Sequence, residues 1–188
     1  MKRCSIISLT LLLLTLLAAP AAASTFSFGN SQYTLVQSSG ISWTDAKLAA
    51  EAAGGHLATI TSAEENNFFK TTIFNNQQNA YWLGAYQTGD NNRKTPTDNW
   101  NWVTGEEWSY TDWSPVEPNN AGNINEVYLS ADSRYGFKWN DEGADVPGQI
   151  RGYVVETTNV APTPIPGAIW ILGASLAALL GFKRKFKK

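Results

Sequence analysis

The stretch SWTDAKLAAEAAGGHLATI occupies residues 42–60 and contains the clearest fold signals in the chain. Ser42 is a preferred helix N-cap, because its hydroxyl can accept a hydrogen bond from a backbone N–H of the first turn. The pair Gly54-Gly55 is a typical helix end, since glycine readily adopts the left-handed conformation that closes a helix. The stretch therefore predicts a helix that begins after Ser42, followed by a strand or turn at 56–60.

A second helix is predicted after Ser62, which has a glutamate three residues later. Ser62 and Glu65 match the capping box, in which each side chain bonds the backbone N–H of the other residue. Phe68, Phe69 and Ile73 would form the apolar face of this helix. The rest of this region predicts short strands joined by unusually long loops, which is typical of an α+β fold. The strands are expected at 27–37, 80–85, 100–103, 126–130, 136–139 and 151–156.

Both ends of the chain carry segments of another kind. Residues 1–23 combine a basic start, an apolar run and small residues, which predicts a secretory signal peptide. At the other end a Pro/Thr linker (157–166) precedes an apolar run (167–182) and a basic tail (183–188). The run would span about 24 Å as a helix, somewhat short for a bilayer core. The basic tail would stay cytoplasmic and leave the upstream region outside.

The order of proline motif, apolar helix and basic tail resembles the PEP-CTERM sorting signal of Gram-negative bacteria, although Thr163 stands where glutamate is usual. The resemblance implies an exosortase that cuts near the proline motif and releases or transfers the protein at the envelope. A plain membrane anchor is the alternative. Either way the domain is expected outside the cytoplasm, at the outer surface or in the extracellular matrix.

Residues 24–156 have the length of one domain with its own core. All sixteen acidic residues but only seven of the fourteen basic ones fall there, so its formal charge is −9. Nucleic acid and anionic membranes are therefore poor partners, whereas cations and neutral ligands are compatible. The single cysteine, Cys4, lies in the predicted signal peptide, so no disulfide can stabilise the domain. Burial of apolar side chains, including seven of the eight tryptophans, must do so.

Side-chain oxygen is concentrated in EPNNAGNINE (117–126) and in WND (139–141), and no lysine or arginine interrupts the first of these stretches. Seven motifs around them, in this order, resemble a C-type lectin-like domain over roughly 33–156. They are the opening stretch (42–60), SAEENNFF (62–69), YWLG (81–84), WNWVTGE (100–106), Trp113 with EPN (117–119), KWND (138–141) and YVVE (153–156).

The resemblance implies an α+β fold with two helices, two small antiparallel sheets and a long loop region that carries the ligand site. Disulfides usual in the family are missing. Ala50 and Val155 would occupy one cysteine pair, and Tyr128 and Ala144 the other.

The resemblance also implies a Ca²⁺ site whose ligands bind the sugar as well. Calcium prefers six to eight oxygen ligands, and water or neighbouring sugar hydroxyls would complete the shell. Pro118 would follow a cis peptide bond, and the Glu-Pro-Asn order is the family's version for mannose- or glucose-type sugars. Asn125 is the alternative to Glu126, because the spacing is one residue longer than usual. The expected metal-binding and sugar-binding residues are Glu117, Asn119, Glu126, Asn140 and Asp141.

Two other classes of function remain open. A glycosidase needs two opposed carboxylates, and Glu107 with Asp112 or Glu117 could be so arranged, but a single histidine cannot serve a catalytic triad. An enzyme is therefore not expected. A calcium-independent adhesion or protein-binding module of the envelope or exopolysaccharide matrix is the main alternative to a lectin that binds glycans or exopolysaccharide. Removal of calcium by chelation discriminates between the two.

Overall fold

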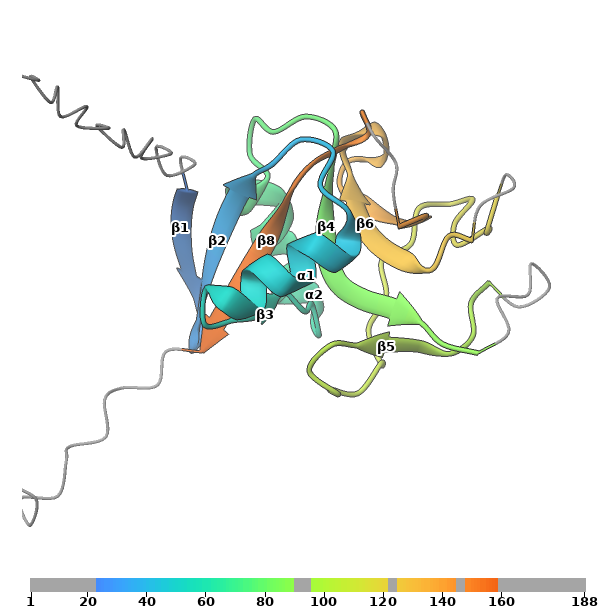
Figure 1. Ribbon diagram of the computed structural model, residues 1–188, viewed down its shortest axis with the longest axis horizontal. Coiled ribbons are helices and arrows are strands. Elements are labelled where there is room, and N and C mark those ends of the chain that lie inside the picture. Colours follow the sequence, from blue (N-terminus) through green and yellow to red (C-terminus); the bar gives the residue numbers. More distant parts are fainter. Residues whose placement is uncertain (1–22, 90–95, 122–124, 145–147, 159–188) are drawn as a thin grey trace, which may run out of the picture.

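The computed structural model describes residues 23–158, except for 90–95, 122–124 and 145–147. The described part is an α+β domain in which two α-helices accompany an eight-stranded sheet (Figure 1). Both ends of this part lie on one flank of the domain, and the long loop region lies on the opposite flank (Figure 1). The predicted signal peptide up to residue 22 and the chain from 159 onward, with its apolar run, lie outside the described residues. Within the described part, no helix is long and apolar enough to cross a membrane.

The first strands form a hairpin, where a single strand over 27–37 was predicted. Strand β1 (Ala23–Phe28) pairs antiparallel with β2 (Ser31–Gln37). The single-strand prediction was wrong because Gly29, with φ of +58°, reverses the chain between them. Since Ala23 already pairs with Val36, the sheet begins one residue before the expected domain boundary.

One connected sheet replaces the two small sheets that the resemblance implied. Its central strands, β4 and β8, hydrogen-bond side by side in parallel, and this contact joins what would otherwise be two antiparallel halves. The strand order is β1-β2-β8-β4-β6-β7, with β3 on β8 and β5 on β4. The strands after the hairpin are β3 (His56–Leu57), β4 (Ala80–Gln87), β5 (Trp100–Trp102), β6 (Tyr128–Asp132), β7 (Lys138–Glu142) and β8 (Ile150–Thr158).

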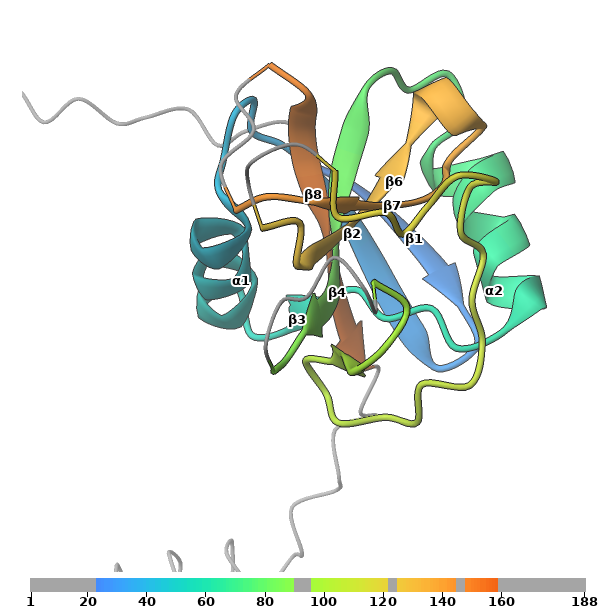
Figure 2. The same ribbon diagram turned by 90° about the vertical axis from the view of Figure 1, so that its right-hand side faces the viewer.

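Both predicted helices begin at their predicted caps. Ser42 accepts a hydrogen bond from the Asp45 N–H at the start of α1 (Trp43–Ala52). Ser62 likewise accepts from the Glu65 N–H at the start of α2 (Ala63–Phe68), which continues into the π-helical turn η1 (Phe69–Ile73). The capping box is only half formed, because the Glu65 carboxylate accepts from the N–H of Thr61 rather than that of Ser62. The two helices lie on opposite sides of the sheet (Figure 2).

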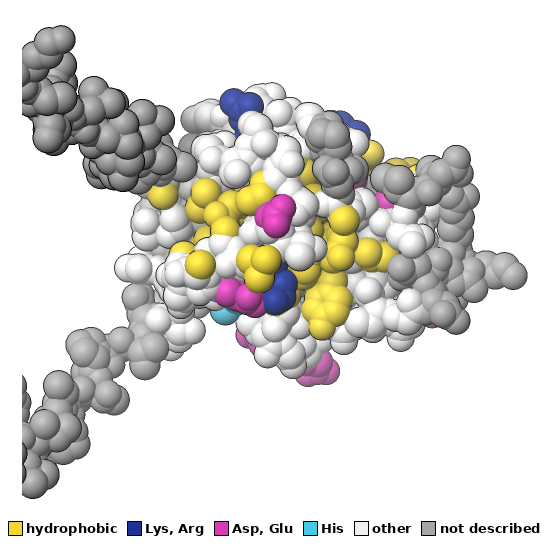
Figure 3. All heavy atoms as spheres, in the orientation of Figure 1, with side chains coloured by type: hydrophobic (Ala, Val, Ile, Leu, Met, Phe, Trp, Pro, Cys, Tyr) yellow, Lys and Arg dark blue, Asp and Glu magenta, His cyan; other side chains and the backbone are white. Residues whose placement is uncertain are grey.

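Aromatic side chains dominate the core on both sides of the sheet. Trp82, Trp102 and Trp139 are fully buried. On the α1 side, Ala50 and Val155 are packed in one apolar cluster, so two positions expected for a cysteine pair contribute to burial instead. The face that carries α1 shows hydrophobic side chains over much of its middle, with a few acidic and basic ones among them (Figure 3).

Asp112 connects three elements on the α2 side. Its carboxylate accepts hydrogen bonds from the Asn66 amide of α2 (2.8 Å), from Lys138 of β7 (2.7 Å) and from Lys70 of η1. Burial alone would raise the pKa of Asp112, but the bonds from Lys138, Lys70 and Asn66 outweigh it and hold the pKa below its ordinary value of 3.8. The ionised form is thus favoured in the folded state.

Asp112→Asn should therefore lower the free energy of unfolding at pH 7 by about 2 kcal/mol, because hydrogen bonds to a charged group are replaced by weaker ones. A pKa that is depressed by folding adds stability above the unfolded value, and this stability is lost as pH falls through the folded value. The difference between the wild type and the variant in urea unfolding should shrink as pH falls below 3.8. Glu51→Gln, which breaks only an exposed pair with Lys47, should change stability by less than about 0.5 kcal/mol. Equal losses in the two variants would contradict this role of Asp112.

Candidate functional site

Four of the five expected ligands lie around one pocket of about 260 Å³. Glu117 and Asn119 come from the loop that follows Trp113, Glu126 lies two residues before the start of β6, and Asn140 belongs to β7. The pairing of β6 with β7 brings Glu126 close to Asn140, and hydrogen bonds from the backbone of Asn119 and Asn120 to Asp141 hold the loop of Glu117 against β7. Glu126 lines the pocket, whereas the alternative ligand Asn125 is not among its lining residues.

The fifth residue, Asp141, is buried and hydrogen-bonds to the backbone of the loop that carries Asn119. Its side chain is 1% exposed. Both carboxylate oxygens accept from the Asn119 N–H at 3.1 Å, and Oδ2 also accepts from the Asn120 N–H at 2.7 Å. Asp141 therefore fixes the backbone that presents the Asn119 side chain to the pocket.

Glu117 is the most unusual carboxylate of the site. The peptide bond between Glu117 and Pro118 is cis, as the resemblance implied. The Oε2 atom of the Glu117 side chain is buried and has no hydrogen-bond partner among the described residues. Burial, followed by the nearby carboxylates of Asp141 and Glu126, raises the pKa of Glu117 to about 7. Burial also raises the pKa of Asp141. Several carboxyl groups are thus held close together with little compensating charge.

This arrangement suits a hard divalent cation, although some of its side chains bond to other groups of the protein. Glu126 accepts from the Ala121 N–H, and the Asn140 amide donates to Glu142 at 2.7 Å. Over the described ranges, no three acidic, histidine or cysteine side chains are already grouped as a metal cluster. An unpaired buried carboxylate oxygen is costly, and a cation bound by Glu117 would remove that cost. The donor set of three carboxylates and two amides is also the chemistry that Ca²⁺ prefers.

Comparison with known proteins agrees with the fold. The family model described as the Lectin C-type domain matches residues 39–149, more than half of the chain. The chain belongs to the C-type lectin domain family. Two curated relatives are perlucin from Haliotis laevigata (33% identical, 54% of this chain and 66% of perlucin) and the alpha-N-acetylgalactosamine-specific lectin from Patiria pectinifera (30% identical, 48% and 52%). The alignments thus span between about half and two thirds of these relatives.

Solved structures of C-type lectins and related proteins share the fold at lower identity. The cow C-type carbohydrate-recognition domain of CD23, solved in the presence of a GlcNAc2Man3 oligosaccharide, has a TM-score of 0.57 at 24% identity and covers 75% of this chain and 95% of its own. A calcium-independent type II antifreeze protein has a TM-score of 0.56 at 19% identity, over 74% and 98% of the two chains. The fold therefore occurs both in a carbohydrate-recognition domain and in a calcium-independent protein.

The pocket of this C-type lectin domain also contains residues that the sequence analysis missed. Glu142 is 2% exposed, and burial raises its pKa to about 7. Arg134 lies 3.5 Å from Glu142 and donates from Nε to Asp132 at 2.7 Å. Strand alternation could have identified Glu142, because Asn140 and Glu142 are two residues apart and share one face of β7. No comparable pattern marks Arg134, since its position depends on the turn η2 (Ser133–Tyr135).

Proposed function

We propose that this C-type lectin domain binds a glycan through one Ca²⁺ ion held by Glu117, Asn119, Glu126, Asn140 and Asp141. The observation that carries the proposal is the pocket where four of these side chains meet, next to the unpartnered Oε2 atom of Glu117. Sequence similarity to lectins supports the carbohydrate class of ligand. Nothing in this arrangement calls for bond cleavage, so binding without turnover is proposed.

The protein's own groups can perform two tasks at once in such a site. A carboxylate such as Glu117 can bind the metal and accept a hydroxyl proton from the sugar. The amide of Asn119 can give its oxygen to the metal and donate N–H to a sugar oxygen. The ion would add a charge on which two neighbouring hydroxyls of the sugar can converge. Asp141 supports this shell because it anchors the backbone of Asn119 and Asn120.

A preference for mannose- or glucose-type sugars is proposed from the order Glu117-Pro118-Asn119. One relative, the Patiria pectinifera protein, is a lectin specific for alpha-N-acetylgalactosamine, which is not a mannose- or glucose-type sugar. Exchange of the acid and the amide should therefore alter the choice of sugar. Glu117→Gln with Asn119→Asp is expected to shift binding from mannose to galactose on a glycan array run with calcium. Addition of EGTA should abolish binding by both proteins. An unchanged sugar profile would disprove the proposed preference.

A calcium-independent binding module is the second candidate. Two observations favour it: the antifreeze protein with the same fold, and the hydrogen bonds that Asn140 and Glu126 already make within the protein. Binding to an envelope or matrix partner that persists in EGTA would support this candidate over the lectin.

For the two ends of the chain, we propose export by the signal peptide and processing or anchoring at the C-terminal apolar run. The domain would then act at the outer surface or in the extracellular matrix, after cleavage by an exosortase-like enzyme or while held by the uncut helix. The intact mass of the protein recovered from the envelope and from the medium would test this. A mass that includes residues 167–188 would exclude cleavage at the proline motif.

A further inference from the structure

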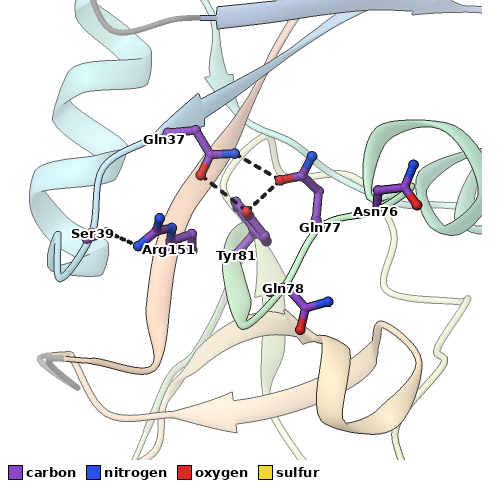
Figure 4. Close-up of a pocket in the computed structure, with 7 residues that line it drawn as sticks. All are labelled: Gln37, Ser39, Asn76, Gln77, Gln78, Tyr81 and Arg151. Atoms are coloured by element: carbon purple, nitrogen blue, oxygen red, sulfur yellow. Dashed lines mark hydrogen bonds between the residues drawn. The ribbon is translucent and has the colours of Figure 1, made fainter.

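A second pocket, of about 370 Å³, lies apart from the expected calcium ligands. The end of β2, the segment between η1 and β4, and the beginnings of β4 and β8 form it (Figure 4). Four amide side chains, one phenol and one guanidinium contribute to its lining. These residues are Gln37, Asn76, Gln77, Gln78, Tyr81 and Arg151.

Three of these side chains, those of Gln37, Gln77 and Tyr81, lie within hydrogen-bond distance of one another. The Tyr81 hydroxyl lies within hydrogen-bond distance of Gln77 Oε1 (2.9 Å) and Gln37 Oε1 (3.2 Å), and Gln37 Nε2 donates to Gln77 Oε1 at 3.0 Å. The Tyr81 side chain is only 1% exposed, and its ring stacks on Phe74 with 5.4 Å between centroids. The buried ring fixes the Tyr81 hydroxyl, so this hydroxyl is preorganised for hydrogen bonding, whereas the Gln37 side chain is exposed.

The neighbouring segment, residues 76–79, forms the wall of the pocket and also has a defined backbone conformation. Asn76 and Asn79 flank Gln77 and Gln78, and both asparagines adopt left-handed conformations with φ of 60° and 66°. Asparagine tolerates this conformation better than most residues. The carbonyl of Asn79 accepts from the Ser133 N–H at 3.0 Å, which ties the segment to η2. The amides of Asn76 and Gln78 make no bond to the other residues drawn in Figure 4 and extend from this wall.

Among the described residues that line this pocket, Arg151 is the only charged one. Its Nη1 donates to the Ser39 hydroxyl at 3.0 Å. No carboxylate of the described residues lies within salt-bridge distance of this guanidinium, although the acidic residues outnumber the basic ones in 24–156. A guanidinium presents a planar fork of donors that matches a carboxylate in a bidentate manner. Arg151 thus lacks a carboxylate partner and lies beside amides that can bond hydroxyls. This combination indicates a ligand that carries both a carboxylate and hydroxyl groups.

We propose that the pocket of Tyr81 and Arg151 is a calcium-independent subsite for a uronate, an acidic sugar whose carboxylate binds Arg151 and whose hydroxyls bind the amides. The ligand would be one acidic unit in a largely neutral saccharide, because the net charge of −9 disfavours a polyanion. A smaller pocket of about 220 Å³ shares Arg134 and Gln149 with the calcium-site pocket and is also lined by Asn79, the neighbour of Gln78 in the chain.

The full chain should be titrated in EGTA with a trisaccharide that contains one glucuronate, and separately with the same trisaccharide after reduction of the carboxyl group to an alcohol. Calorimetry or NMR shifts would report binding. The wild type is expected to bind the acidic trisaccharide at least about tenfold more tightly than the reduced one, since hydrogen bonds to a charged group contribute more than neutral ones. Arg151→Gln should remove this tenfold preference and leave the unfolding midpoint close to that of the wild type.

Lys47→Gln is the matched control, because it removes one positive charge from the exposed surface of α1. It should retain the preference for the acidic trisaccharide. Equal weakening by Lys47→Gln and Arg151→Gln would reveal general charge attraction and overturn the proposal. Equal affinity for the acidic and reduced sugars, or no measurable binding in EGTA, would overturn it too. Since EGTA is present throughout, failure of the calcium site cannot produce or hide the expected result.

Discussion

Replacement of Asp141 by asparagine is expected to abolish calcium-dependent sugar binding in a protein that still folds. Asparagine keeps the shape of the side chain and one acceptor oxygen for the backbone of Asn119 and Asn120. It removes a negative charge and one oxygen from the proposed metal shell. Loss of a group that merely supports a metal ligand weakens affinity 10–100-fold, so loss of a ligand should weaken calcium binding at least about 100-fold. Calcium titration by calorimetry measures the effect.

The control for Asp141→Asn is Glu51→Gln, which also removes one negative charge but on the exposed surface of α1. Its calcium affinity should match that of the wild type. Circular dichroism should show that the Asp141 variant retains the secondary structure of the wild type. Unchanged calcium binding by a folded Asp141→Asn protein would place the metal elsewhere or remove it from the proposed function.

Among the substitutions considered, Gly152→Ala should cause the largest loss in the free energy of unfolding. A Cβ atom at Gly152 would lie 1.9 Å from the carbonyl oxygen of Val36 and 3.2 Å from the Cα of Gln37, both backbone atoms of the paired strand β2. Neither strand can move without disruption of the ladder between β2 and β8. Overpacking costs 1–3 kcal/mol where side chains can adjust. This backbone clash should therefore lower the free energy of unfolding by more than about 3 kcal/mol, out of a total of about 5–15 kcal/mol. Urea unfolding measures the loss.

Gly105→Ala is the control for this prediction, because it measures the cost of a left-handed backbone without a steric clash. Gly105 has φ of +78°, but an added Cβ would meet no atom within 4 Å. Its cost should be limited to about 1–2 kcal/mol for a left-handed alanine. If Gly152→Ala were no more destabilising than Gly105→Ala, the close approach of β2 and β8 would not limit stability as proposed.

Local signals were sufficient to predict the helices but not the sheet. Ser42 and Ser62 cap where predicted because a cap depends on residues only two or three positions away. The hairpin at Gly29 was missed because the flanking residues have strand propensity on both sides. The parallel contact between β4 and β8 joins segments about 70 residues apart, and no local pattern encodes it.

The candidate site was predictable to the extent that it follows a motif. The resemblance led to five expected ligands, of which four line one pocket and the fifth, Asp141, accepts a hydrogen bond from the backbone of Asn120. The contact of Arg134 with Glu142 depends on how η2 meets β7, so sequence alone did not reveal it. The pocket of Tyr81 and Arg151 combines residues from distant segments, and only Tyr81, in YWLG (81–84), belongs to one of the seven motifs.

Since the described chain enters and leaves on the flank opposite the long loops, attachment at either end would point the loops away from the support (Figure 1). Copies fixed side by side on a cell or a bead would then present their loops in a common outward direction. Such an array can engage several branches of one polymer, and linked binding events of this kind can raise avidity by a factor of about 10²–10⁴ without any new contact. Even a weak individual site could thus provide firm adhesion.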